Sequence, residues 1–270
     1  MKRTGIVIVL LAASFGLISL GNARRVPPTS VQDDLQVMVP VPLQILGAFG
    51  DRYFAANAGT WRAIMVSPRH LSQDELTALA QIQETVSWLN PGHEDNYYTA
   101  TAILPWAGKT DSTQRILKRA TDNRPTDLYA PFFYAFNALH FYQDRLAASQ
   151  ALLVAASHAP DPGDKQGLTV LAARWLEKGD NLNNAQRVVL QMAKDTRDPA
   201  LKAHLTHRAE RLAGLITLRD AAQRYETQYG RKLDNLNQLV SSGIIRQLPT
   251  DPFGDGYALS GHQPVFAPPR

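Results

Sequence analysis

The chain has 270 residues, 44% of them hydrophobic, which is enough to bury a sizeable core in one large unit or two small ones. Its formal net charge is only +4, and no block of basic residues alternates with aromatic ones, so we do not expect nucleic-acid binding. Cysteine is absent, which excludes disulfides, thiolate catalysis, cysteine-ligated zinc and a lipid-modified N-terminal cysteine.

The N-terminal segment carries one long apolar run. Residues 4–23 are uncharged and stand between two pairs of basic residues. A helix of this length spans the roughly 30 Å hydrocarbon layer of a bilayer, which predicts a signal anchor over residues 1–25 in contact with lipid through residues 4–23. The alternative is a secretory signal peptide cleaved after Ala23, where small residues precede the cut.

An anchor with so short a leading tail leaves the long C-terminal part translocated, so the bulk of the chain is predicted to lie in the periplasm. Residues 26–42 contain four prolines and no hydrophobic period. They are predicted to form a linker that holds the following domain away from the bilayer.

Helices are predicted on both sides of residue 70. Pro42 stands where the first turn of a helix tolerates proline, and Ser72 with Glu75 forms a capping-box pattern. An apolar period of three and four then runs to Leu89 and ends at Asn90-Pro91-Gly92. In the first segment the apolar residues with helical spacing are Leu43, Leu46, Tyr53, Phe54, Trp61, Ile64 and Met65.

Residues 93–197 contain a helical hairpin that recurs. Two copies 35 residues apart equate Thr113, Leu117, Ala120 and Pro125 with Ala148, Leu152, Ala155 and Pro160, and Tyr97 with Phe132. A looser third copy follows 37 residues later, with Ala185, Val189 and Met192. This pattern resembles the tetratricopeptide repeat, whose 34-residue unit is a pair of antiparallel helices closed by a proline. Pro105 interrupts the first copy.

The resemblance implies a mainly α fold, an irregular tetratricopeptide-like α-solenoid of helical hairpins over residues 43–199. Residues 200–230 show a 3.6-residue apolar period and end at a glycine, so they are predicted to form one long helix. This helix is expected to cap the stack, because an end repeat otherwise leaves its apolar face open.

The C-terminal segment has a different pattern. Residues 218–266 resemble the C-terminal part of the major pseudopilins of bacterial type II secretion, and the matching residues are Tyr225, Gly230, Leu236, Leu239, Leu248, Pro249, Asp251, Pro252, Phe253, Gly254 and Tyr257. The resemblance implies that residues 231–270 form a small α+β tail with a short helix, a turn and a hairpin. The Gly-Phe-Thr-x-x-Glu processing site of pilins does not precede the hydrophobic run.

No pattern for a nucleophile elbow, a phosphate-binding loop or a dinucleotide site is present, so we expect no enzyme, no cofactor and no small-molecule substrate. The triplet His93-Glu94-Asp95 is interpreted as the start of a helix, because neighbouring side chains on a helix point in different directions. His204 and His207 lie three apart but make too few ligands for a metal site. Asp251 and Asp255 are weak calcium candidates, and the alternative is an Asp-Pro turn.

In tetratricopeptide arrays the first helix of each unit lines the concave face. The resemblance therefore implies a partner-binding face whose candidate residues are Tyr98, Trp106, Phe133, Asn137, His140, Phe141, Arg174 and Lys178. Asn137 is the candidate that clamps a peptide backbone, because an amide both donates and accepts. The alternative is that Tyr98, Phe133 and Phe141 fill the core of the stack.

Together these patterns predict a scaffold or adaptor on the bacterial inner membrane, single-pass and mostly periplasmic, that binds a protein partner of the cell envelope. The resemblance of the tail implies a secretion, pilus or surface-polymer assembly system. The alternatives are a structural subunit associated with a pseudopilus and an envelope enzyme.

Overall fold

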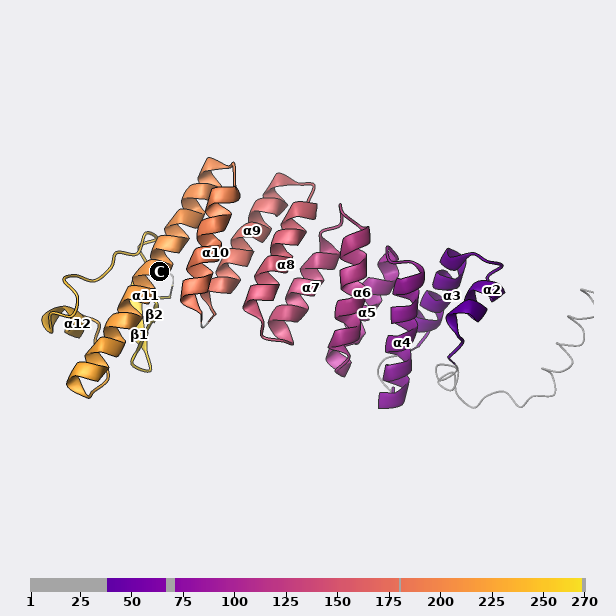
Figure 1. The fold of residues 1–270 in the computed structure, drawn as a ribbon, viewed down its shortest axis with the longest axis horizontal. Helices are drawn as coiled ribbons and strands as arrows, with labels where there is room; N and C mark the ends of the chain where they lie inside the picture. Colours follow the sequence, from indigo (N-terminus) through magenta and orange to yellow (C-terminus); the bar gives the residue numbers. More distant parts are fainter. Residues whose placement is uncertain (1–37, 67–70, 180, 269–270) are drawn as a thin grey trace, which may run out of the picture.

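The computed structural model describes residues 38–66, 71–179 and 181–268. Its fold is mainly α, as predicted, with helices that follow one another side by side in an extended row from α2 to α11 (Figure 1). The helices of the first half are α2 (Val41–Gly47), α3 (Arg52–Ile64), α4 (Gln73–Leu89), α5 (Glu94–Ile103), the 3₁₀ turn η3 (Pro105–Ala107) and α6 (Thr110–Asn123).

The second half continues the row and then changes character. Its helices are α7 (Tyr129–His140), α8 (Arg145–His158), α9 (Pro162–Glu177), α10 (Leu182–Asp195), α11 (Pro199–Tyr229) and α12 (Asn237–Ser241). An antiparallel hairpin of β1 (Tyr257–Ser260) and β2 (Gln263–Phe266) ends the chain, which confirms the small α+β tail.

Within the described residues no helix combines the length and the apolar character that a bilayer crossing requires. The anchor predicted over residues 1–25 and most of the linker predicted over residues 26–42 lie outside the described part. Helix α2 begins at Val41, so the predicted linker boundary at residue 42 is wrong by two residues.

Helix boundaries follow from local hydrogen bonds that the sequence encodes. Both bonds of the predicted capping box form, because the Ser72 side chain accepts from the backbone N–H of Glu75 and the Glu75 carboxylate accepts from the backbone N–H of Ser72. Helix α11 ends at Gly230, which adopts a left-handed φ of 66° that glycine tolerates without strain.

The second helices of the predicted repeat copies bury matching positions. Thr113 of α6, Ala148 of α8 and Ala185 of α10 are all buried, and their small side chains let neighbouring helices approach closely. One helical turn further on, the matched positions hold larger buried side chains: Leu117, Leu152 and Val189. These residues belong to two hydrophobic clusters that extend along the row, one around α4 to α7 and the other around α7 to α11.

Helix α3 packs with its small residues inward. Ala55, Ala56, Thr60 and Ala63 are buried against α4, and a Cβ atom on Gly59 would lie only 2.7 Å from Val86 Cγ2. The bulky apolar residues whose spacing predicted this helix are on the exposed side. The helix is confirmed, but its large residues do not face the core of the stack.

Helix α11 serves two neighbours along its length. Leu205 and Leu212 belong to the cluster shared with α9 and α10, whereas Leu218 and Tyr225 belong to a cluster with Leu239 of α12 and other residues of the tail. The long helix predicted over residues 200–230 is confirmed, and it carries the tail as well as covering the end of the row (Figure 1).

Candidate functional site

Aromatic side chains gather on the neighbouring helices α5 and α7 and on the turn η3. The ring centroids of Tyr98 and Phe133 lie 5.6 Å apart. The ring centroid of Trp106 lies 5.3 Å from that of His140 and 5.1 Å from that of Phe141. We call this set the aromatic surface, and its members are Tyr98, Trp106, Tyr129, Phe133, Phe136, His140 and Phe141. It includes five of the eight residues predicted to line the partner-binding face.

The spacing on α7 explains how one helix supplies most of this surface. Tyr129, Phe133, Phe136 and His140 are separated by four, three and four residues, so they lie on one side of the helix. Their rings form two pairs along that side, since Tyr129 stacks on Phe133 and Phe136 stacks on His140. The aromatic stripe therefore runs along the whole of α7.

The proline that interrupts the first repeat copy places Trp106. Helix α5 ends at Ile103, and Pro105 starts a 3₁₀ turn that closes at Gly108 with a φ of 76°. Trp106 in this turn is 63% exposed although it touches two rings of α7. Tyr129 at the other end is also exposed, and Tyr98, Phe133, Phe136 and Phe141 are half-buried between them. The surface is thus open at both ends and supported in the middle.

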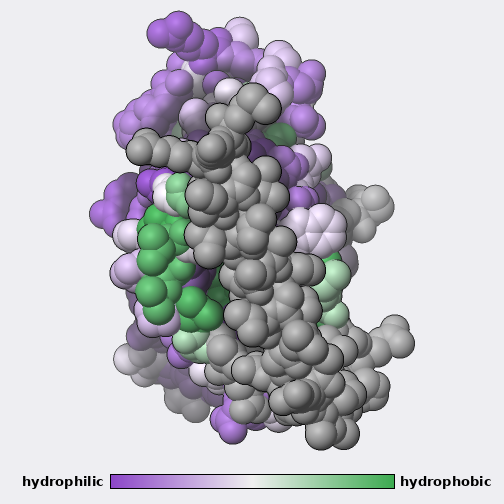
Figure 2. Space-filling view, turned by 90° about the vertical axis from the view of Figure 1, so that its right-hand side faces the viewer, coloured by the Kyte–Doolittle hydropathy of each residue, from purple (hydrophilic) through white to green (hydrophobic). Residues whose placement is uncertain are grey.

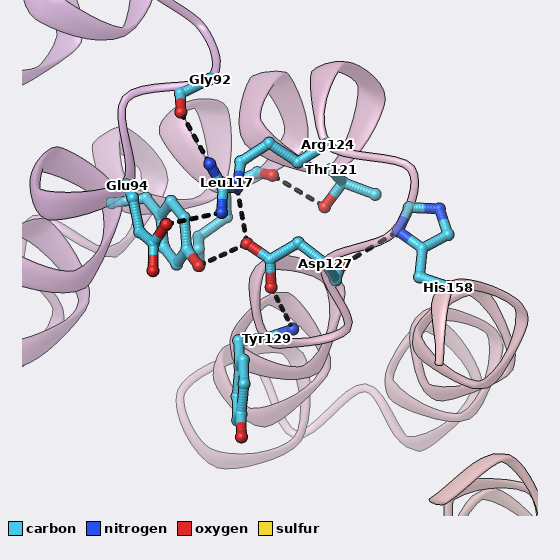
Figure 3. A network of polar contacts seen from close by, with 9 residues as sticks. Gly92, Glu94, Leu117, Thr121, Arg124, Asp127, Tyr129 and His158 are labelled. Carbon is cyan, nitrogen blue, oxygen red and sulfur yellow. Dashed lines mark hydrogen bonds and ion pairs between the residues drawn. The ribbon is translucent and has the colours of Figure 1, made fainter. Parts of the chain in front are cut away.

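A network of polar contacts links the start of α5 to the start of α7 (Figure 3). The Asp127 carboxylate accepts from the Tyr97 hydroxyl and from Arg124 Nε, both at 2.6 Å, and from the Tyr129 backbone N–H at 2.9 Å. Arg124 also donates to Glu94 at 2.7 Å and to the Gly92 carbonyl at 3.1 Å. These residues link the start of α5, the end of α6 and the start of α7.

The same contacts set the ionisation of the network. Burial by itself would raise the pKa of Asp127, but the hydrogen bonds from Tyr97, Arg124 and the Tyr129 backbone lower it below its usual range. Burial and the bond to Asp127 raise the pKa of the Tyr97 hydroxyl. Asp127 is therefore ionised and Tyr97 neutral at neutral pH. Both are fully engaged in structural bonds, which suits a support and not a reacting group.

Asn137 does not lie on the aromatic surface, so its predicted role as a peptide clamp is wrong. It is only 1% exposed, and its Nδ2 donates to Gln114 Oε1 of α6 at 3.4 Å. Gln114 in turn donates to the Tyr134 carbonyl. Asn137 thus contributes to the contact between α6 and α7, because that side of α7 is covered by the preceding helix.

Arg174 of α9, the first helix of the next hairpin, and Lys178, the C-cap residue of that helix, are exposed. As exposed cations they are accessible to an acidic ligand. The structure does not join them to the aromatic rings by any contact among the described residues, so they form a separate cationic position on α9.

The weak calcium candidates are engaged by a cation of the protein itself. Arg211 Nε lies 3.0 Å from Asp251 Oδ2, and Arg211 Nη2 lies 3.3 Å from Asp255 Oδ2. Asp251 also accepts from the backbone N–H of Phe253 and Gly256, which is the predicted alternative of an Asp-Pro turn. The structure thus favours the turn over a calcium site, because a guanidinium of the protein itself pairs with both carboxylates.

The histidines and the triplet at residue 93 have structural surroundings. His204 and His207 both make edge contacts with the Phe253 ring of the tail. His93 is the N-cap residue of α5, with Glu94 and Asp95 in the first turn, which confirms that the triplet starts a helix. Among the described residues no group of three or more His, Asp or Glu side chains is arranged to hold a metal ion.

The geometry defines an elongated, mainly helical protein with an exposed aromatic surface on two neighbouring helices. No family model matches the sequence, and no curated protein or solved structure matches it either. Sequence analysis did not assign Tyr129 and Phe136 to the surface or Asp127 to its support. The four-three-four spacing on α7 contained the signal for Tyr129 and Phe136, whereas nothing local indicated that Tyr97 would reach Asp127.

Proposed function

We propose that this chain is a membrane-anchored, extracytoplasmic scaffold that binds a protein partner of the bacterial envelope through its aromatic surface. The hairpins α5–α6, α7–α8 and α9–α10 are then tetratricopeptide-like units of an irregular α-solenoid. The buried matching positions of α6, α8 and α10 and the side-by-side order of the helices support this interpretation.

The exposure of Trp106 beside His140 and Phe141 is the observation that supports partner binding most directly. Tryptophan and tyrosine contribute much of the binding free energy at protein interfaces when a partner buries them in a packed centre. Rigid helices that already hold the rings in contact reduce the ordering cost on binding. The exposed cations Arg174 and Lys178 on α9 provide a second contact for an acidic segment of the same partner.

Substitution of Trp106 tests this function. Trp106→Ala is expected to weaken partner capture from detergent-solubilised membranes by at least tenfold, because a tryptophan that a partner buries contributes about 2 kcal/mol or more. Tyr229→Ala is the matched control, since Tyr229 is also an exposed aromatic residue but stands at the end of α11, outside the aromatic surface. Equal capture by Trp106→Ala and the unchanged protein contradicts the proposal.

The tail supports a second candidate, a structural subunit associated with a pseudopilus. The short helix, turn and hairpin fall where the pseudopilin resemblance places them, and they pack on the end of a long helix. This candidate predicts that the chain co-fractionates with pilin-like proteins. Recovery of the chain only as a monomer from cells with an intact filament argues against it.

A further inference from the structure

The N-terminal end of the row presents bulky apolar side chains outward. Figure 2 looks onto this end and shows hydrophobic residues gathered on one side of it. In helix α2, Leu46 is 72% exposed, and in α3, Trp61 is 65% exposed. We call the following set the end face: Leu43, Leu46, Phe49, Tyr53, Phe54, Trp61, Ile64, Met65 and Trp88, all of them exposed.

The end face on α3 is a continuous stripe. With a turn of about 3.6 residues, positions 53, 54, 61, 64 and 65 fall within roughly one third of the helix circumference. The buried alanines and Gly59 occupy the opposite side against α4. In a helix that faces water, the large apolar residues pack against the core and polar residues point outward. Helix α3 has the reverse arrangement, with small residues inward and large apolar residues outward. An apolar surface of this kind marks a contact with another phase or molecule.

We propose that the end face lies in the lipid interface of the membrane that holds the anchor. This inference rests on the anchor that is part of the proposed function. It identifies the second contact of the chain with lipid, through α2, α3 and the end of α4, and it replaces the expectation that residues 26–42 hold the whole domain away from the bilayer. The occupant is therefore a phospholipid bilayer, at the depth of the headgroups and upper acyl chains.

The composition of the end face fits that depth. Trp61, Trp88 and Tyr53 combine apolar rings with a single polar atom, and such side chains are enriched at the boundary between lipid and water. Residues 38–66 contain only three charged side chains. Asp51 is used as the N-cap of α3, and Arg52 donates to the carbonyls of Trp88 and Leu89. Insertion at the interface thus requires little desolvation of charge.

The distance along the chain also favours lipid over a soluble partner. The apolar run over residues 4–23 ends close to α2, with only residues 24–40 between them. Seventeen residues span at most about 60 Å when fully extended, so the end face stays within that distance of the end of the apolar run. Such a tether raises the effective concentration of lipid at the end face, and even a weak interfacial contact is then occupied.

Because the chain has no cysteine, a single introduced cysteine reports on each position of the full-length protein. Leu46→Cys places an environment-sensitive fluorophore on the end face. Leu190→Cys is the matched control, since Leu190 is an exposed leucine of α10, which lies in the C-terminal half of the row. Both variants are reconstituted in phosphatidylglycerol and phosphatidylethanolamine vesicles, with or without brominated acyl chains. Resistance to alkaline extraction measures the anchor separately.

The proposal predicts that the fluorophore at position 46 in vesicles emits at a shorter wavelength and more strongly than the same fluorophore on a short peptide in detergent-free buffer. Brominated lipid is expected to quench this emission. Position 190 is expected to show neither change.

If brominated lipid does not quench the emission at position 46, the proposal is overturned. The anchor is still supported in that case if the chain resists alkaline extraction. A blue shift without quenching, combined with cross-linking between two copies at position 46, shows that the end face contacts a second copy of the chain. This result also overturns the lipid proposal. Extraction of the chain at alkaline pH contradicts both the anchor and this inference. The partner assay with Trp106→Ala tests partner binding independently of the extraction result.

Discussion

Gly214 determines how closely the C-terminal hairpin approaches α11. The Tyr257 hydroxyl donates to the Arg211 carbonyl at 2.9 Å, and a Cβ atom on Gly214 would lie 2.1 Å from the Tyr257 hydroxyl oxygen and 2.8 Å from Cζ. No side chain larger than hydrogen fits between the helix and this ring. The same ring is half-buried, and burial raises the pKa of Tyr257 to about 12, so the hydroxyl remains a donor across the physiological range.

Gly214→Ala is therefore expected to lower the free energy of unfolding by about 1–3 kcal/mol, because the hairpin must shift away from α11. Gly167→Ala is the matched control on α9: a Cβ atom there meets nothing within 4 Å, and the gain in helix propensity is about 0.5–1 kcal/mol. Urea unfolding in detergent compares the two. Adding Tyr257→Phe to Gly214→Ala should recover part of the loss, and equal stability of the two glycine variants contradicts the assigned contact.

Asp127 makes a pH-dependent contribution to stability. Its pKa is lowered in the folded chain, so its contribution is fully present above the unfolded value of about 3.9 and is lost as the pH falls through the lower folded value. Asp127→Asn is expected to cost about 1–3 kcal/mol at pH 7 and to flatten the decline of stability below pH 4. Unfolding curves recorded between pH 3 and pH 7 measure both effects.

Asp122→Asn is the control for this prediction. Asp122 pairs with Lys118 at 3.1 Å on the surface of α6, and both side chains are more than half exposed. An exposed pair of this kind contributes about 0.5 kcal/mol or less. If Asp122→Asn and Asp127→Asn have the same effect at pH 7, the Asp127 network does not support the aromatic surface as described.

At the scale of single elements, α4 is defined by its first turn. The Ser72 hydroxyl accepts from the Glu75 N–H at 3.3 Å, and Ser72→Ala leaves that donor without its partner at a cost of about 1 kcal/mol. Amide hydrogen exchange is expected to accelerate in the first turn of α4. Gln73→Ala, one position later on the exposed side, serves as the control, and unchanged exchange in Ser72→Ala contradicts the capping assignment.

The sequence predicted the features of each element that depend on neighbouring residues, but not those that depend on residues far apart in the chain. The capping box, the end of α11 at Gly230 and the break at Pro105 were predicted because each depends on residues within one helical turn. The orientation of α3 was not predicted, since periodicity shows that a helix has an apolar stripe but not that Gly59 and its neighbouring alanines pack against Val86.

The candidate site shows the same division. Trp106 and His140 were assigned to one surface from the repeat pattern, and their rings are in contact. Asn137 was misassigned because only the packing of Gln114 from α6 reveals that this side of α7 is covered. The pairing of Asp251 with Arg211 was also missed, since the two residues are brought together by the return of the tail onto α11.

At the scale of the whole molecule, the row of helices separates two surfaces of different chemistry. The aromatic surface lies on α5, η3 and α7, and the end face lies on α2, α3 and the end of α4, helices that Figure 1 places at the N-terminal end of the row. In the arrangement that we propose, one end of the row is held at the lipid interface and the aromatic surface faces the periplasm. The proposed scaffold would then have a fixed orientation in which it captures a partner beside the membrane.

Site-specific photo-crosslinking in intact cells tests the central claim most directly. A photo-reactive amino acid in place of Trp106 samples the aromatic surface, and the same amino acid in place of Tyr229, exposed at the end of α11, samples a surface of similar accessibility elsewhere. The proposed function predicts one discrete protein adduct from position 106 that is missing from position 229. No adduct from position 106, or the same adducts from both positions, contradicts partner binding through the aromatic surface.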